Sequence, residues 1–309
     1  MTEGRYVTTA PRVGIVGVGR MGWHIAARIA AAGFHVTAFD PRPEVMQEIG
    51  SIGLKPAASS RAVAEASDVT ILMVLDGQQA LDATFGTDGF ADGAHSDSIL
   101  LCMASLRPSD VRALDERADG RFIVLDAPVS GGVEGAKAGS LTVMASGDPE
   151  ALDAVAPVLK HMSSAIYRLG ERPGLGAVMK SINQSMFLAS LVSSAEMLIA
   201  GVKAGLDPDQ VIEVVSRSSG DSWALRNRLP LAWRTNYVSG GALGLMLKDL
   251  ASGIDLADEA GVDAVSTRAA ATVVREAYER HAGRGDDPLI VETLEARSGV
   301  MLRERASVL

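Results

Sequence analysis

Residues 12–22 have the sequence RVGIVGVGRMG, a short apolar run followed by the glycine pattern G-x-G-x-x-G. In this pattern we expect Gly17 to permit a tight turn, Gly19 to let the backbone approach a pyrophosphate, and Gly22 to allow close packing of a helix on the strand. The same loop holds three further candidate cofactor contacts: Val18, Arg20 and Met21. Because a strand leads into the pattern and a helix opens from it, the stretch predicts a dinucleotide-binding βαβ unit.

The second expected strand of this unit ends at Asp40, about where the acidic residue that binds ribose stands in such units. A carboxylate can accept both hydroxyls of the adenosine ribose and would repel a 2′-phosphate, so Asp40 favours NAD. Arg42 lies two residues further on and could instead pair with a 2′-phosphate. The pair of residues therefore predicts NAD and leaves NADP open.

The first half of the chain alternates short β-prone runs with helical patterns. We expect strands at 13–16, 36–40, 69–74, 99–103, 122–126, 141–145 and 165–169. Strands and helices that alternate at this spacing are typical of a mostly parallel, doubly wound sheet of the Rossmann type.

The second half of the chain is predicted to be helical. Residues 177–204 are nearly all apolar or small, which predicts a long helix buried between a domain and a partner subunit. Further helices are expected at 208–218, 222–234, 243–260, 263–282 and 288–297. We therefore divide the chain of 309 residues into a flexible tail at 1–11, a Rossmann domain at 12–173 and an all-α domain at 174–309.

Composition restricts the partners. The net charge is −9 with acidic and basic residues interspersed, which argues against nucleic acid and against an anionic membrane surface. The single cysteine, Cys102, is typical of a reducing compartment, and we expect neither a secretory signal nor an apolar stretch long enough to span a bilayer. The five histidines lack metal-ligand spacing, so no metal site is expected. These features predict a cytoplasmic protein.

Four separated segments make the chain resemble the β-hydroxyacid dehydrogenases: residues 14–23, 126–148, 174–185 and 243–250. The resemblance covers about residues 12–298. It implies an NAD(P)-dependent enzyme that transfers a hydride between nicotinamide and a small hydroxy acid, and that assembles as a homodimer or homotetramer.

The resemblance also implies roles for individual residues. The loop of Ser130, Gly131 and Gly132 would bind a substrate carboxylate through its N–H groups and hydroxyl. Lys180 would be the acid–base group, because a lysine in an apolar helix is costly unless it is paired or used, and burial lowers the pKa of an ammonium group. The remaining implied substrate residues are Asn183, Gln184 and Asp249, and the remaining cofactor residues are Val74, Leu75, Ser105 and Lys248.

The chain departs from the family pattern at two positions that matter for the pocket. Many members have Asn where this chain has Gln184, and the family commonly has Phe where this chain has Gly241. The Asn183–Gln184 pair favours a polar substrate. Candidate substrates are 3-hydroxyisobutyrate, D-glycerate with tartronate semialdehyde, and L-threonate.

Two other functions are weighed against this one. Imine reductases that use NADPH resemble the chain, but they usually have Asp or Tyr where Lys180 stands. A non-catalytic nucleotide-binding module would have lost that lysine. Lys180 therefore favours the dehydrogenase.

Overall fold

The structure is a computed structural model that describes residues 11–304. The tail expected at 1–11 lies outside the described residues except for Pro11. The chain forms two compact units, the first ending at Lys180 and the second beginning at Ser181. The predicted domain limits, 12–173 and 174–309, stay a prediction.

The first unit is built on a six-stranded parallel sheet in the order β3-β2-β1-β4-β5-β6. Its strands are β1 (Val13–Val16), β2 (Val36–Phe39), β3 (Lys55–Pro56), β4 (Val69–Leu72), β5 (Ile99–Cys102) and β6 (Ile123–Asp126). The order reverses beside β1, as in a doubly wound sheet. The fold class predicted from the sequence is confirmed.

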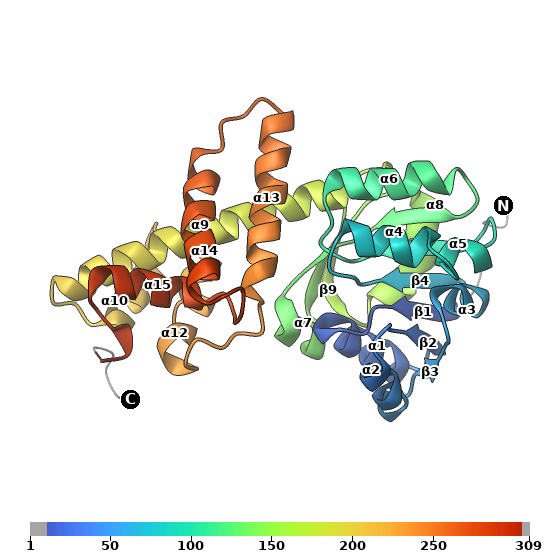
Figure 1. Ribbon diagram of the computed structural model, residues 1–309, viewed down its shortest axis with the longest axis horizontal. Coiled ribbons are helices and arrows are strands. Elements are labelled where there is room, and N and C mark those ends of the chain that lie inside the picture. The colour runs from blue at the N-terminus through green and yellow to red at the C-terminus, as the bar shows by residue number, and fades with distance from the viewer. Residues whose placement is uncertain (1–10, 305–309) are drawn as a thin grey trace. The chain divides into compact units, whose positions relative to one another are not determined.

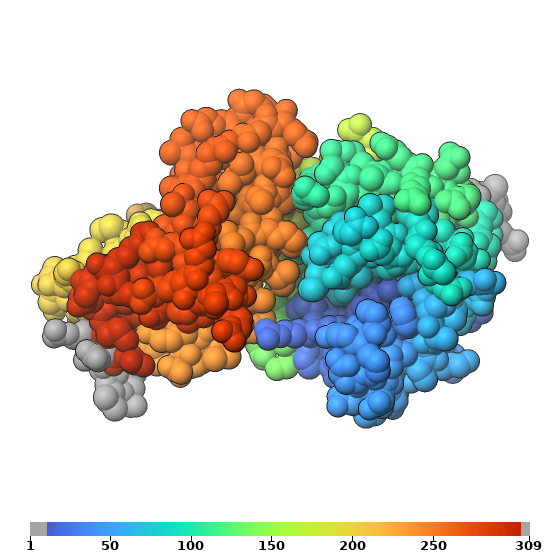
Figure 2. Space-filling view, in the orientation of Figure 1, coloured from blue at the N-terminus to red at the C-terminus, as the bar shows by residue number. Residues whose placement is uncertain are grey.

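Helices cover both faces of this sheet because alternate residues of each buried strand point to opposite sides. On one face Val16, Leu72 and Leu100 pack against helices, and on the other Ile15 and Ile71 do so. The first face is covered by α3 (Ser60–Glu65), α4 (Gly77–Phe85), α5 (Phe90–Gly93) and α6 (Pro108–Ala118), and the second by α1 (Arg20–Ala31), α7 (Gly132–Ala138) and α8 (Pro149–Leu159) (Figure 1). In Figure 2, α4, α5 and α6 form the turquoise and green surface of this unit.

The strands expected at 141–145 and 165–169 belong to a separate sheet, which corrects their place in the fold. This sheet has the order β7-β8-β9, with β7 (Val129–Ser130) antiparallel to β8 (Leu141–Ala145) and β8 parallel to β9 (Ser163–Arg168). Near this junction Asp126 and Ser146 exchange backbone hydrogen bonds of 2.9 and 2.7 Å. The second sheet thus attaches at the carboxyl end of β6.

The second unit is helical. Its elements are the greater part of α9 (Leu175–Lys203), then α10 (Pro208–Val215), α11 (Trp223–Asn227), α12 (Leu231–Arg234), α13 (Leu243–Glu259), α14 (Val265–Arg280) and α15 (Leu289–Ser298). The single helix expected at 222–234 is two short helices, α11 and α12, because Pro230 follows a turn between them. Leu188, Leu191 and Leu250 lie in the apolar core of this unit.

Among the described residues, α9 is long and apolar enough to cross a membrane on length and composition alone. The expectation that no such stretch exists was therefore wrong. However, α9 carries the core residues Leu188, Leu191 and Leu198, which are almost completely buried within the second unit. Core helices of soluble proteins have this character, so the helix is consistent with a soluble protein.

Candidate functional site

The glycine loop has the backbone geometry that its pattern predicts. Gly17 has a φ of +95°, and a Cβ there would lie 2.3 Å from the Met73 carbonyl oxygen. A Cβ on Gly22 would lie 2.2 Å from the Gly17 carbonyl oxygen. Gly19 caps α1 without a side-chain hydrogen bond, and a Cβ there would meet nothing nearer than 3.9 Å. Gly17 and Gly22 therefore make the turn and the packing possible, while Gly19 leaves room for a phosphate group above the helix.

Asp40, directly after β2, is buried and forms an ion pair with Arg42. Arg42 Nε and Nη2 donate to the two carboxylate oxygens over 2.7 and 2.8 Å, and the Val18 N–H donates to Oδ2 over 2.8 Å. Burial alone would raise the pKa of Asp40, but the hydrogen bonds from Arg42 and Val18 outweigh it and hold the pKa below its ordinary value. Asp40 is therefore an ionised acceptor beside the glycine loop.

The other expected cofactor residues of this unit follow the carboxyl ends of neighbouring strands. Val74 and Leu75 follow β4, and Ser105 follows β5. Leu75 is exposed, and its N–H donates to Gln79 Oε1 over 3.1 Å. Arg20 and Met21 begin α1. Since parallel strands end at one edge of the sheet, these residues gather where open α/β sheets bind ligands.

The expected substrate loop joins β7 to α7. Ser130 ends β7, and Gly131 and Gly132 have φ angles of +132° and +63°, which strongly favour glycine. A Cβ on Gly131 would also lie 3.0 Å from a methyl group of Leu141. The two glycines thus form the turn that leads from Ser130 into α7.

Asp126 fixes the start of α9, a contact that the sequence analysis missed. Its Oδ2 accepts hydrogen bonds from the N–H groups of Gly174 and Ala177 over 3.1 and 2.7 Å. The Gly176 N–H donates to the Ser146 hydroxyl over 3.0 Å. Asp126 ends β6, four residues before Ser130 in the chain. One buried carboxylate therefore ties the first turn of α9 to the base of the substrate loop.

Burial raises the pKa of Asp126 to about 7, although the hydrogen bonds from Ala177, Gly174 and Ser146 oppose the rise. Its second oxygen, Oδ1, is buried without a hydrogen-bond partner among the described residues. Lys180 lies one turn beyond Ala177 on α9 and is only 8% exposed. Through its hydrogen bonds to the start of α9, Asp126 therefore helps to fix the backbone that carries Lys180.

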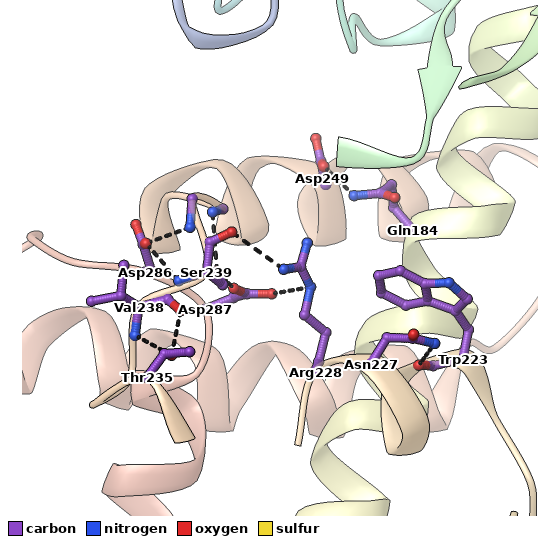
Figure 3. Close-up of polar contacts among 12 residues, drawn as sticks. Gln184, Trp223, Asn227, Arg228, Thr235, Val238, Ser239, Asp249, Asp286 and Asp287 are labelled. Carbon is purple, nitrogen blue, oxygen red and sulfur yellow. Dashed lines mark hydrogen bonds and ion pairs between the residues drawn. The ribbon is translucent and has the colours of Figure 1, made fainter. Parts of the chain in front are cut away.

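The second unit brings together four predicted residues from α9 and α13. Asn183 donates to Gln184 Oε1 over 3.2 Å, and Gln184 Nε2 donates to Asp249 Oδ2 over 2.7 Å (Figure 3). Lys248 pairs with Asp249 Oδ1 over 3.0 Å. A hydroxyl pair, Ser181 with Ser252 at 2.8 Å, joins the two helices nearby. This chain of polar contacts holds the Gln184 amide in one orientation.

Gly241 lies beside a second group of polar residues that sequence reasoning did not find. A Cβ on Gly241 would lie 3.1 Å from Asp287 Oδ1, so the buried Asp287 side chain occupies the space next to this glycine. Asp287 is paired with Arg228. Arg228 follows α11 and Asp287 precedes α15, far apart in the chain, so no local signal in the sequence links them.

Comparisons with known proteins match both halves of the chain. Residues 12–170 match the model of the NAD-binding domain of 6-phosphogluconate dehydrogenase, and residues 174–294 match that of the NAD-binding region of NADP-dependent 3-hydroxyisobutyrate dehydrogenase. The chain is 33% identical to an L-threonate dehydrogenase of Cupriavidus necator, over 91% of this chain and 95% of that protein. It is 34% identical to a 3-hydroxyisobutyrate dehydrogenase of Pseudomonas aeruginosa, over 87% and 92% of the two chains.

Comparisons with solved structures also match nearly the whole chain. A 3-hydroxyisobutyrate dehydrogenase from Salmonella typhimurium superposes with a TM-score of 0.82 at 29% identity, covering 91% of this chain and 99% of that chain. An imine reductase from Streptomyces aurantiacus is a weaker neighbour, with a TM-score of 0.63 at 21% identity. The likeness to the imine reductase shows a shared fold only.

Proposed function

Since the chain belongs to the β-hydroxyacid dehydrogenase family and is an NAD(P)-dependent oxidoreductase, we propose that Lys180 is its acid–base group in the oxidation of a small hydroxy acid. The observation that carries this proposal is a buried lysine one turn beyond the anchored start of α9. A lysine in such buried surroundings is suited to proton transfer.

The glycine loop and Asp40 suit a nicotinamide dinucleotide, which accepts the hydride when it is bound. Gly19 leaves space at the start of α1 for the pyrophosphate, and Asp40 offers a carboxylate for the ribose hydroxyls. Lys248 is proposed to contact the cofactor. The residues that follow β4 and β5, namely Val74, Leu75 and Ser105, are proposed to contact it as well.

On the substrate side, the Ser130–Gly132 loop is proposed to bind the carboxylate of the hydroxy acid. Lys180 Nζ then accepts the hydroxyl proton as the hydride leaves the same carbon, and in the reverse direction it returns the proton to the carbonyl oxygen. Asn183, Gln184 and Asp249 would orient the substrate and Lys180. The names of the relatives suggest L-threonate and 3-hydroxyisobutyrate as first substrates to assay.

The direct test is a panel of hydroxy acids with NAD and with NADP, followed by nicotinamide absorbance. We expect oxidation of at least one member of the panel. Cofactor binding with no turnover of any hydroxy acid would favour a non-catalytic nucleotide-binding module, and turnover of cyclic imines instead would favour an imine reductase.

NAD is the proposed cofactor because Asp40 already holds Arg42 in a two-point ion pair. In Asp40→Asn the charge that repels a 2′-phosphate is lost and Arg42 is released. We expect the ratio of kcat/KM for NADP to that for NAD to rise by about tenfold or more, the effect of one charge-assisted hydrogen bond. Steady-state kinetics with both cofactors measure it.

The matched control is Asp68→Asn. Asp68 also pairs with an arginine, Arg12, over 2.7 Å. However, it precedes β4 and so lies at the amino-terminal ends of the strands, away from the expected cofactor site. Its replacement is expected to leave the cofactor ratio unchanged. An unchanged ratio in Asp40→Asn would rule out the proposed discrimination.

A homodimer, or a homotetramer made of two dimers, is proposed from an apolar stripe on α9. Met179, Ile182, Met186 and Met197 are exposed and recur at helical spacing, so they share one face. Exposed apolar residues gathered in this way are typical of an interface.

A cytoplasmic location is proposed because the single cysteine, Cys102, is free and buried.

Met186→Glu is expected to dissociate the oligomer, because it places an unpaired charge on this stripe. Met186 is 67% exposed in the single chain, so the fold itself should tolerate the change. Sedimentation velocity measures the result, with Val214→Glu on α10 as the control at another exposed apolar position. An equal effect of both substitutions would exclude α9 as the interface.

A further inference from the structure

Arg228, just after α11, is held by two polar contacts of its guanidinium group. Its Nε lies 3.3 Å from Asp287 Oδ2, and its Nη1 donates to the Ser239 carbonyl oxygen over 3.4 Å (Figure 3). The Arg228 side chain is 16% exposed. The recorded contacts within the described part of the chain use Nε and Nη1, so the Nη2 end of the fork has donors to spare.

The partner of Arg228 is itself firmly held. Asp287 Oδ1 accepts a hydrogen bond from the Ser239 hydroxyl, and the Asp287 N–H donates to the Gly241 carbonyl oxygen over 2.8 Å. The neighbouring Asp286 accepts from the N–H groups of Ser239 and Gly240 over 2.9 and 2.6 Å. The segment 239–241 and the two aspartates therefore form a rigid base that orients Arg228.

A tryptophan gives Arg228 its second support. The guanidinium carbon lies 5.3 Å from the centre of the Trp223 ring, which is a cation–π distance. Trp223 is 49% exposed, so the indole is not a core residue. It makes an edge-to-face contact with Phe187 of α9, with ring centres 5.6 Å apart.

These contacts link Arg228, through Trp223 and Phe187, to the helix that carries two of the proposed substrate residues of the second unit. Phe187 follows Gln184 by one turn of α9 and Lys180 by two, which is about 10 Å along the helix axis. In Figure 3 the Arg228 side chain and the Trp223 ring lie below Gln184 and Asp249, and the guanidinium is directed toward them. The Asp249 carboxylate is already engaged by Gln184 and Lys248.

We propose that Arg228, supported by Trp223, binds a second carboxylate at the far end of the substrate, so that the enzyme prefers hydroxy dicarboxylates. A planar, oriented guanidinium with spare donors matches the geometry of a carboxylate, and the indole face excludes water from one side. The inference rests on the proposed function, because it assigns a substrate class to the same site. It distinguishes this chain from an enzyme for hydroxy acids with an apolar end.

The test compares matched pairs of 2-substituted 3-hydroxypropanoates with NAD. The dicarboxylates are 2-(hydroxymethyl)succinate and 2-(hydroxymethyl)glutarate, and their methyl-ended analogues are 2-(hydroxymethyl)butanoate and 2-(hydroxymethyl)pentanoate. We expect kcat/KM to favour at least one dicarboxylate over its analogue by about tenfold or more. In Arg228→Gln this ratio should fall to near one.

Two further variants make the outcome interpretable. Arg226→Gln is the control, because Arg226 lies on α11 and pairs with Asp221 instead. It should keep the preference. Arg228→Gln combined with Asp287→Asn removes the pair together, so that no buried charge is left alone, and it should lose the preference even if the single variant unfolds.

Calorimetric binding of the same compounds gives a readout that does not depend on turnover. Wild-type protein with NADH, which cannot accept the hydride, should bind the dicarboxylate more tightly than its analogue by about tenfold, and the Arg228 variants should bind the two equally. A wild type without this preference in either pair, or a preference that survives in Arg228→Gln and in the double variant, overturns the inference. Failure to oxidise any hydroxy acid, with the binding preference intact, would instead count against the proposed function alone.

Discussion

Lys180→Ala is expected to lower kcat for hydroxy-acid oxidation by about 10²- to 10⁴-fold, the usual contribution of a positioned acid–base group. The hydroxyl proton would then have no acceptor at the atom where the proposed mechanism needs one. Binding of NADH, followed by its fluorescence, should stay nearly unchanged, because the glycine loop and Asp40 belong to separate elements. Loss of turnover together with intact NADH binding would indicate that Lys180 acts in proton transfer and not in cofactor binding.

Lys180→Met is the companion variant, because it keeps most of the apolar volume of the lysine stem and should fold as the wild type does. Lys203→Ala is the control on the same helix. Lys203 lies in the last turn of α9, where it donates to the Ser298 carbonyl oxygen over 2.9 Å, and its loss should not affect kcat. Near-normal turnover in both Lys180 variants would refute the proposed mechanism.

Asp126→Ala is expected to cost about 2–4 kcal/mol of unfolding free energy, because the buried N–H groups of Gly174 and Ala177 lose their acceptor. It should also lower kcat at temperatures where the variant is folded, since the first turn of the helix that carries Lys180 is no longer fixed. Chemical denaturation and steady-state kinetics measure the two effects. Asp148→Ala is the control, because Asp148 caps α8 through the Ala151 N–H and its loss should affect stability without affecting kcat.

The pH dependence follows from the raised pKa of Asp126. The folded-state value of about 7 exceeds the unfolded value of about 3.9, so the folded state binds more protons between pH 4 and 7. Stability from this group is therefore fully present below pH 4 and is lost as the pH rises through about 7.

Asp126→Asn removes this titration and keeps the size of the side chain. The stability of the wild type relative to this variant should fall as the pH rises from about 4 to 7, by an amount on the order of a few kcal/mol. Asp287 and Glu295 also have raised pKa values, mainly through burial, and they contribute equally to both proteins. An equal pH dependence in the two proteins would show that Asp126 does not titrate in this range.

The sequence by itself determined the nucleotide-binding unit and the existence of α9. The reason is that these features depend on short-range constraints. The need for glycine at positions 17 and 22 arises within one strand–turn–helix, where a Cβ would touch neighbouring backbone oxygen atoms. A long run of apolar residues likewise predicts a buried helix without knowledge of its surroundings. The Rossmann-type sheet followed by helices was predicted on these grounds and is confirmed.

The sheet to which a strand belongs was decided only by the tertiary structure. The residues of β8 have the same β-prone pattern as those of the central strands, yet β8 pairs with β7 and β9. Strand pairing depends on which distant partner is available, and β-propensity contains no such information. The two-residue strand β3 is too short to leave a pattern.

The same distinction applies to the candidate site. Lys180, Gln184 and Asp249 could be named from motifs, although the hydrogen bond between the last two joins residues 65 positions apart. Asp126 and Arg228 could not be given their structural roles, because Asp126 acts on a helix 51 residues away and Arg228 acts through Asp287 and Trp223. Local patterns identify the residues that carry chemistry, whereas the groups that orient them are chosen by packing between distant segments, which only the folded chain brings together.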